Sequence, residues 1–406
     1  MNFKKILFTL VFVLSLLSVS AYAKTMQFTM KDYDAKVDDG AITVHTMEVA
    51  PYTVEGRTMV PVRIVGETFG ADVQYIYEEN KVVITLGDKT ISLIIGQDEA
   101  TVNGEVVPMD VPSYETNGRT LVPLRFVSET LGFHVKYVAS TEQILITDDA
   151  AVVELNGSKI FLAELNAAYD LYNMEYGSYY GEDEILSSAM LMMMNYAVYD
   201  SESNKWDIGY PFEYKEEIKA TVSDLEAYFP EILDGVWANL LEIEYRTSAL
   251  NNFLYQSYLP DKADIEEYRS TAFGDYMAAK HILVSDKEKA ADILNEIKNG
   301  ADFDELMNEY SEDPGLYTNP DGYVFTDGEM IEEFEAAVKK LKVGEVSGIV
   351  ESEFGYHIIK RIEIPAEYVA ASYVDEAIAN HYTGVIENGE VKADTYTSEQ
   401  LIEFCK

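Results

Sequence analysis

The sequence is nearly without cysteine. Among its 406 residues there is one, Cys405, which lies next to the end of the chain. An exported protein with a single cysteine forms no internal disulfide bond. Because chain ends are usually poorly ordered, we interpret Cys405 as an incidental thiol and not as a catalytic nucleophile.

Positive charge is also scarce. Thirty lysine and arginine residues stand against 72 acidic ones, so the formal net charge is −42. Nucleic acids and anionic lipid surfaces bind basic proteins, so we expect neither as a partner. The acidic excess suits solubility in a polyanionic cell wall or a salty exterior. It also repels acidic client proteins and attracts basic ones.

Long apolar runs are absent beyond the first residues, which have the pattern of a secretory signal. Lys4–Lys5 precedes the apolar run Ile6–Val19, and Ala21–Ala23 forms a small-x-small cleavage site. The run is short for a membrane span, and no cysteine follows it that would take a lipid. We therefore predict a signal peptide over 1–23. The mature chain then begins near Lys24, with a net charge of −44 (−42 − 2) and no membrane anchor.

An internal repeat occupies residues 24–150. Residues 56–63, Gly-Arg-Thr-Met-Val-Pro-Val-Arg, return as Gly-Arg-Thr-Leu-Val-Pro-Leu-Arg in residues 118–125, at an offset of 62 residues (119 − 57). Each copy predicts a strand, a short helix (Val62–Phe69 and Leu124–Leu131), a glycine at the helix end and then a hairpin.

This motif, present twice, resembles the copper amine oxidase N-terminal-like domain of secreted bacterial proteins. The region has only His45 and His134, whereas a copper site needs clustered imidazoles, so we expect an attachment or interaction module without a metal or other cofactor. Two roles are open for the motif's arginines. They bind an anionic cell-wall polymer, or they pair with Glu67 and Glu129.

Residues 151–277 change character. A small hairpin is predicted over 152–160, followed by helices, and Asp264 is predicted to cap the last of them. The helix expected at 185–199 is rich in methionine, which fills a helical core or binds unfolded chains through flexible thioethers. Both interpretations are open for Met190, Met192, Met193 and Met194.

Two short apolar segments, each with one histidine, mark the ends of the stretch 278–363. The first is Ala-Ala-Lys-His-Ile-Leu-Val, with His281, and the second is Phe-Gly-Tyr-His-Ile-Ile-Lys, with His357. Such runs are typical of buried strands, and amphipathic helices are predicted between them. We expect both strands in one sheet.

Further motifs follow in order between these strands: Ser311–Asp313, Asp-Gly-Tyr-Val-Phe at 321–325, Gly-Glu-Met at 328–330 and Gly-Glu-Val-Ser at 344–347. Together with the histidine strands, they resemble the parvulin family of peptidyl-prolyl isomerases over the whole domain. Upstream, the hairpin, the helices and the segment Asp264–Tyr268 resemble the N-terminal chaperone region of PrsA/SurA-type extracytoplasmic foldases.

The parvulin resemblance implies a pocket for the proline ring. By that resemblance, Phe325, Met330 and Phe334 form its walls, and Leu283 lines its floor. Isomerisation rotates a bond with a barrier of about 18–20 kcal/mol and breaks no covalent bond, so the pocket must bind the twisted amide best. Without the family pattern, the i, i+4 spacing of Met330 and Phe334 is ordinary core spacing.

The resemblance also implies a polar group beside the twisting amide. His281 and His357 form a facing pair, and Asp313 takes the position that holds Cys or Asp in parvulins, with an electrostatic or hydrogen-bonding role. The residues alone leave another role open, in which the histidines share a hydrogen bond and stiffen the sheet.

Two segments depart from the parvulin pattern. The loop 285–287 contains no basic cluster, whereas a phosphate-reading parvulin needs arginines there, so we predict no requirement for phosphorylated substrate. The usual segment Gly-Gly-Asp-Leu-Gly is Asn-Pro-Asp-Gly-Tyr at 319–323, which predicts a different pocket rim and lower activity.

The sequence predicts a multidomain α+β protein. After the signal peptide, a β-rich repeat module (24–150) precedes a helical chaperone-like region (151–277), a parvulin domain with a four-stranded antiparallel sheet and surrounding helices (278–363), and a tail (364–406). The tail is expected to pack on the helical region and to end in a helix over 398–405.

The predicted function is that of a secreted peptidyl-prolyl isomerase and foldase of a Gram-positive-type bacterium, at the cell surface or in the wall. The expected partners are unfolded exported proteins with X-Pro bonds, and a cell-wall polymer for residues 24–150. The alternatives are a non-catalytic chaperone and a wall-attached binding protein with a degenerate parvulin domain.

Overall fold

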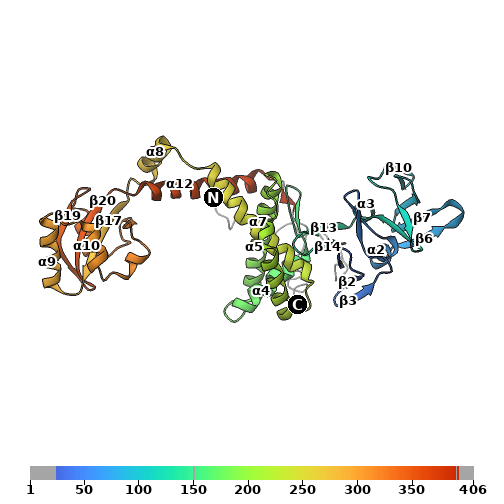
Figure 1. Cartoon of the computed structure of the whole chain (residues 1–406), viewed down its shortest axis with the longest axis horizontal. Helices are drawn as coiled ribbons and strands as arrows, with labels where there is room; N and C mark the ends of the chain where they lie inside the picture. The colour runs from blue at the N-terminus through green and yellow to red at the C-terminus, as the bar shows by residue number, and fades with distance from the viewer. Residues whose placement is uncertain (1–23, 150, 390, 393–406) are drawn as a thin grey trace. The chain divides into compact units, whose positions relative to one another are not determined.

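The computed structural model describes residues 24–149, 151–389 and 391–392. The predicted signal peptide, the helix expected near the end of the tail and Cys405 lie outside these residues. Within these residues the chain forms two compact units (Figure 1). The first contains the described residues up to Phe253 and from Tyr382 onward, and the second is Leu254–His381.

Three antiparallel sheets form the repeat module of the first unit (blue to cyan in Figure 1). One has the order β13-β14-β1-β2-β3, with β1 Thr25–Thr29, β2 Asp34–Asp38, β3 Ile42–Thr46, β13 His134–Val138 and β14 Gln143–Thr147. Another has the order β10-β9-β8-β7-β6, with β6 Asp72–Ile76, β7 Lys81–Leu86, β8 Lys89–Ile94, β9 Glu99–Val102 and β10 Glu105–Pro108. The third has the order β11-β12-β5-β4, with β4 Tyr52–Val54, β5 Arg57–Pro61, β11 Tyr114–Thr116 and β12 Arg119–Pro123.

The two sequence copies are related by a local two-fold axis. Strands β5 and β12 pair with Val60 opposite Val122, which are equivalent positions because 122 − 60 = 62. The two flanking pairs are Met59 with Pro123, and Pro61 with Leu121. The 62-residue offset converts each of these pairs into the other. Each strand leads directly into its helix, α2 (Val62–Thr68) or α3 (Leu124–Leu131), as the motif predicted.

The second arginine of each motif pairs within its own helix. Arg63 lies 3.2 Å from Glu67, and Arg125 lies 3.6 Å from Glu129, at i, i+4 spacing. The predicted pairing with Glu67 and Glu129 is confirmed for these two arginines.

The first arginine of each motif pairs instead with an acid next to the other copy. Arg57 Nε lies 2.6 Å from Asp110, and Arg119 Nη2 lies 2.6 Å from Glu48. The two acids are themselves equivalent, because 110 − 48 = 62. The pairing prediction is therefore wrong for Arg57 and Arg119, whose partners the local two-fold axis brings close.

A helical region completes the first unit. After a hairpin come the long helices, whose side chains share one core with Val138 and Leu145 of the repeat module. The elements are β15 Val153–Leu155, β16 Ser158–Ile160, α4 Leu162–Tyr176, α5 Glu182–Lys205, η2 Phe212–Tyr214, α6 Lys215–Tyr228 and α7 Asp234–Ser257. The core interpretation holds for the methionines, since Met193 is fully buried and its three neighbours pack partly buried against the same core: Met190, Met192 and Met194.

The N-terminus of α7 is bound to the repeat module through Asp234. Its carboxylate accepts hydrogen bonds from Gln27 Nε2 at 2.8 Å, Lys36 Nζ at 2.7 Å and Gln143 Nε2 at 2.6 Å. The Gln27 carbonyl in turn accepts the Gly235 backbone N–H at 2.8 Å, one of the amides that a helix start leaves unpaired. The repeat module thus caps a helix of the neighbouring region.

The end of helix α12 (Ala366–Asn388) returns to the helical region. Tyr382 donates a hydrogen bond to Asn251 at 2.6 Å and lies edge-on to Tyr199, with ring centroids 5.2 Å apart. Strand β21 (Val391–Lys392) then pairs with β15 in a three-stranded sheet.

The second unit contains a four-stranded antiparallel sheet of order β18-β17-β20-β19, as predicted. Its elements are α8 Lys262–Ala272, β17 Met277–Val284, α9 Lys287–Lys298, α10 Phe303–Tyr310, η3 Pro314–Tyr317, β18 Tyr323–Phe325, α11 Glu332–Val338, β19 Val346–Ser352 and β20 Gly355–Ile362. Helices α9 and α10 cover the face of the sheet that contains Ile282 and Val284 of β17. Helix α11 covers the other face with its own side chains Phe334 and Val338.

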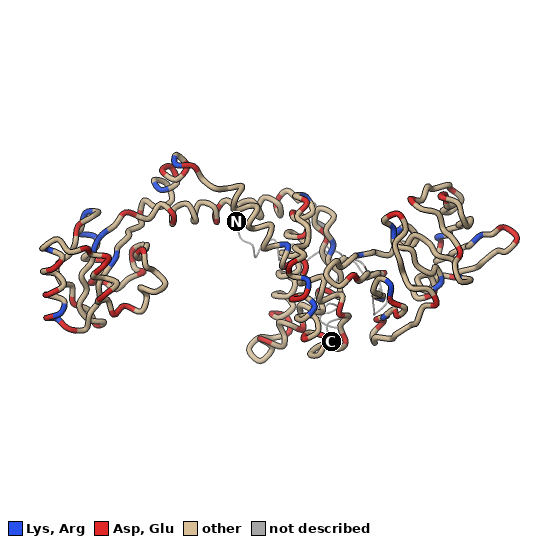
Figure 2. Tube along the Cα trace, viewed as in Figure 1, with Lys and Arg blue, Asp and Glu red and all other residues tan. Residues whose placement is uncertain are grey.

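Acidic residues outnumber basic ones along both units, as Figure 2 shows in red and blue. Among the described residues, none of the helices combines the length and the apolar character that crossing a bilayer requires.

Candidate active site

The two histidines lie on the central strands of the second unit's sheet, on one face. Strands β17 and β20 pair with His281 opposite Ile359, and with Leu283 opposite His357. Because side chains alternate along a strand, His281 and Leu283 share the face that α11 covers. Both imidazoles are buried, with 7% of His281 and 3% of His357 exposed.

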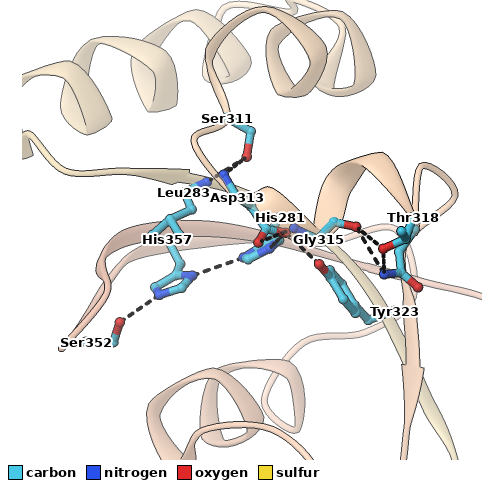
Figure 3. Close-up of polar contacts among 10 residues, drawn as sticks. His281, Leu283, Ser311, Asp313, Gly315, Thr318, Tyr323, Ser352 and His357 are labelled. Carbon is cyan, nitrogen blue, oxygen red and sulfur yellow. Dashed lines mark hydrogen bonds and ion pairs between the residues drawn. The ribbon is translucent and has the colours of Figure 1, made fainter.

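A chain of hydrogen bonds connects these histidines to polar residues on either side (Figure 3). The two Nδ1 atoms of His281 and His357 lie 3.0 Å apart, with the rings nearly parallel at 13°. His281 Nε2 lies 2.8 Å from Asp313 Oδ2, and His357 Nε2 lies 2.7 Å from Ser352 Oγ. We call this chain of four residues the relay.

The relay has a consistent set of donors and acceptors when both imidazoles are neutral. An ionised Asp313 only accepts, so His281 donates from Nε2 and accepts at Nδ1. His357 must then donate from Nδ1 and accept at Nε2 from the Ser352 hydroxyl. Ser352 Oγ also accepts the Phe354 backbone N–H at 3.1 Å, so every member is satisfied.

The surroundings of the relay shift the pKa of two of its members, Asp313 and His357. Burial tends to raise the pKa of Asp313, but hydrogen bonds from Tyr323, His281 and the Gly315 amide outweigh it and hold that pKa below its ordinary value. Burial, aided by the neighbouring His281, lowers the pKa of His357 to about 4. At neutral pH the site therefore presents a carboxylate and a neutral His357.

Backbone contacts fix the loop that presents Asp313. Asp313 caps the short helix η3, accepting the Gly315 N–H at 3.1 Å. The preceding residues join the loop to β17, because the Glu312 N–H donates to the Leu283 carbonyl at 2.7 Å and Ser311 Oγ accepts the Leu283 N–H at 3.2 Å. The carboxylate is thereby held against the histidine strand.

The predicted apolar residues lie beside the relay. The ring of Phe334 is 5.2 Å from that of His281, 6.0 Å from that of His357 and 5.8 Å from that of Phe325. Met330 packs partly buried against the same cluster, and its backbone N–H donates to the buried Glu335 carboxylate at 3.0 Å.

Leu283 shares the strand face but is not a member of this cluster. Six of the seven predicted site residues are in contact with one another: His281, Asp313, His357, Phe325, Met330 and Phe334. Leu283 is close to them only by its position on β17.

Comparison with known proteins identifies two families over parts of the chain. Residues 279–363 match the family model described as PPIC-type PPIase domain, and residues 36–146 match the model described as copper amine oxidase N-terminal domain. The chain contains a parvulin-type rotamase domain. The predicted resemblances to both families are confirmed.

Curated relatives extend the similarity beyond the rotamase domain. The chain is 44% identical over 98 residues to the foldase protein PrsA of Geobacillus kaustophilus, covering 24% of this chain and 34% of that protein. It is 30% identical over 224 residues to PrsA of Halalkalibacterium halodurans, covering 52% and 63%. In four such relatives, the matched segment covers between 34% and 54% of the relative's own length. The chain therefore matches about a third to a half of these proteins.

Solved structures are also similar to parts of this chain. The solution structure of the parvulin of Nitrosopumilus maritimus is 43% identical, covers 22% of this chain and 97% of its own, and has a TM-score of 0.21. The crystal structure of PrsA from Bacillus subtilis is 24% identical, covers 61% and 94%, and has a TM-score of 0.30.

The rotamase domain contains a polar residue that the sequence did not identify as part of the site, Tyr323. Its hydroxyl donates to Asp313 Oδ2 at 2.6 Å, and its ring lies edge-on to His281 at 5.6 Å. Tyr323 occupies the last position of the segment that departs from the glycine-rich parvulin pattern, and this departure was the available signal. Ser352 gave no such signal.

Two glycines permit the backbone arrangement around Tyr323, and Gly315 makes room for its phenol. A Cβ at Gly315 would lie 2.0 Å from the Tyr323 hydroxyl oxygen. Gly322 has a φ of +102°, and a Cβ there would lie 2.9 Å from the Ala279 carbonyl oxygen of the paired strand. A larger residue at Gly315 would displace the phenol from Asp313, and one at Gly322 would clash with strand β17.

Replacing Tyr323 with phenylalanine is expected to raise the pKa of Asp313 toward its ordinary value. The substitution removes one of the donors that stabilise the carboxylate and keeps the ring that packs on His281. The measurement is a pH titration of the Asp313 carboxyl carbon by NMR. The matched control is Tyr317→Phe, because Tyr317 lies on the adjacent short helix with its side chain 93% exposed. An unchanged Asp313 titration in Tyr323→Phe would show that the phenol does not stabilise the charge.

Proposed function

We propose that residues 278–363 act as a peptidyl-prolyl cis–trans isomerase that requires no phosphorylated substrate. The observation that supports this most is the relay of Asp313, His281, His357 and Ser352 beside the aromatic residues Phe325 and Phe334. A buried, fully satisfied polar chain next to apolar and aromatic side chains suits a substrate that has a ring and an amide.

The proposed mechanism uses binding alone. Phe325, Met330 and Phe334 hold the proline ring, while the amide twists above the relay. Twisting removes the resonance of the amide, whose barrier is about 18–20 kcal/mol, and no covalent bond breaks. Fixed charges and dipoles need no rearrangement as the charge of the amide changes, so they stabilise the twisted state preferentially.

The lysines near the site support the absence of phosphate recognition. Lys287 lies 3.4 Å from Glu351, and Lys289 lies 3.2 Å from Glu312. These carboxylates add negative charge beside each lysine, and the loop 285–287 has no arginine fork of the kind that binds phosphate.

For the whole chain we propose a foldase that assists exported proteins outside the cytoplasm. Support comes from the similarity to proteins named foldase PrsA and from the signal pattern of residues 1–23. The proposed clients are unfolded chains with X-Pro bonds, and the proposed location is the cell surface, with the repeat module as the attachment or interaction region.

The test is an exchange assay on an X-Pro peptide with the purified protein. We expect faster cis–trans exchange, measured by NMR line broadening or exchange spectroscopy, and no preference for a phospho-Ser-Pro over a Ser-Pro peptide. A folded rotamase domain, verified by its dispersed NMR spectrum, that leaves the exchange rate unchanged would contradict the isomerase.

A second candidate function is chaperoning without catalysis. Large aromatic side chains in the helical region are strongly exposed, among them Tyr179 at 81%, Phe212 at 69% and Tyr228 at 73%. Exposed rings suit transient contact with unfolded chains. Suppression of client aggregation by a variant without isomerase activity would favour this function.

A further inference from the structure

The repeat module has a cavity of about 570 Å³ that the rotamase chemistry does not use. It is lined by Arg57 of the first motif and Arg125 of the second, with their acidic partners Asp110 and Glu129. Apolar and aromatic side chains complete the lining: Met30, Leu124, Phe126, Val135, Tyr137 and Ile144. The cavity is thus formed by both copies, including strands β13 and β14, together with Met30, which follows β1.

The two arginines have donors to spare. A guanidinium has five N–H groups, and Arg57 uses Nε for Asp110 at 2.6 Å. Arg125 Nε lies 3.6 Å from Glu129, which is an ion pair beyond hydrogen-bonding distance. Within the part of the chain that the structure describes, no partner is found for the terminal Nη groups of either residue.

The existing ion pairs do not prevent a ligand from binding. The side chains of Arg57 and Asp110 are 50% and 67% exposed, and those of Arg125 and Glu129 are 66% and 56% exposed. Exposed pairs of this kind contribute roughly 0–1 kcal/mol, so they rearrange at little cost. The terminal nitrogens present the planar fork that suits a carboxylate.

The charges around the cavity limit the ligand to one anionic group. Asp110 and Glu129 balance the two arginines, and the chain has a net charge of −42, so a polymer with many negative charges is repelled. The apolar lining suits a hydrophobic group next to that anion. We propose that this cavity binds a small ligand that has one carboxylate attached to an apolar or aromatic group, such as the C-terminal residue of a peptide.

The probe for this site is N-acetyl-L-phenylalanine, titrated into the purified full chain and followed by NMR shifts or calorimetry. We expect saturable binding, and about tenfold weaker binding of N-acetyl-L-phenylalaninamide, which lacks the charge. Arg57→Gln and Arg125→Gln are each expected to weaken binding of the acid about tenfold and to leave binding of the amide unchanged.

The local two-fold axis supplies the matched controls. Arg119 and Arg63 are the equivalents of Arg57 and Arg125 and do not line this cavity, so Arg119→Gln and Arg63→Gln are expected to bind the acid as the unmodified protein does. Three results would overturn the proposal: no saturable binding, equal binding of acid and amide, or equal loss in the control variants. Unchanged thermal unfolding of the four variants verifies that each is folded.

Discussion

Replacement of Asp313 with alanine is expected to lower kcat/KM for X-Pro exchange about 100-fold, because removing one preorganised hydrogen-bonding group from an active site costs about that much in rate. The carboxylate accepts hydrogen bonds from His281, Tyr323 and the Gly315 amide. Removing it leaves these donors unpaired in a mostly buried site, at about 1–3 kcal/mol each. The measurement is the exchange rate of an X-Pro peptide against enzyme concentration.

Two variants separate charge from general damage. Asp313→Asn keeps an oxygen acceptor but removes the charge, so we expect an intermediate rate. Asp292→Ala changes an exposed acid on α9 and is expected to leave the rate unchanged. A folded Asp313→Ala protein with a rate near that of the unmodified protein would contradict an electrostatic role for this carboxylate.

Asp313 is important because its charge determines which atom donates and which accepts in each hydrogen bond of the relay. Ser352 closes one end by accepting the Phe354 amide, and Tyr323 closes the other by donating to the carboxylate. When His281 and His357 are both neutral, each hydrogen bond between these two ends then has a single possible donor and acceptor. The twisting amide therefore meets a preorganised set of dipoles, which is the arrangement that favours a transition state over either planar state.

The sequence predicted those parts of the molecule that depend on local patterns. The histidine strands follow from apolar runs, and the 62-residue repeat gave strands β5 and β12 with their helices. Within the site, the order of the motifs predicted His281, Asp313 and His357, which the fold brings within hydrogen-bonding distance. Periodicity and motif order suffice where neighbours in sequence determine the element.

Contacts between distant positions could not be predicted in this way. The ion pairs of Arg57 with Asp110 and of Arg119 with Glu48 depend on how the two copies pack around the local two-fold axis. The repeat in the sequence does not specify that packing. Even a local prediction failed at α8, where Asp264 was expected to be the cap. Asp261 caps the helix, and the Asp264 side chain accepts the Asp261 N–H from the third helical position. Both aspartates fit a helix start, and only the backbone geometry distinguishes them.

The contact between Asp234 and Gln27 spans 207 residues and leads to the other large expected effect. Asp234→Ala is expected to lower the free energy of unfolding of the first unit by about 3 kcal/mol, because it leaves three donors without their acceptor. Those donors keep the pKa of Asp234 below its ordinary value of 3.8 although burial tends to raise it. The stabilisation is therefore present at neutral pH and is lost as the pH falls through the lowered pKa. Urea unfolding at several pH values measures the difference.

The control for Asp234 is Asp224→Ala, which changes an exposed acid on α6 and is expected to leave stability nearly unchanged. A second variant tests the same contact from the helix side. A Cβ at Gly235 would lie 2.7 Å from Gln27 Oε1. Gly235→Ala should therefore displace the Gln27 side chain and destabilise strands β1 and β14. Hydrogen exchange then shows where the effect lies. We expect faster exchange in β1 and β14 of both variants, and if those amides remain as protected as in the unmodified protein, Asp234 does not bind the repeat module to α7.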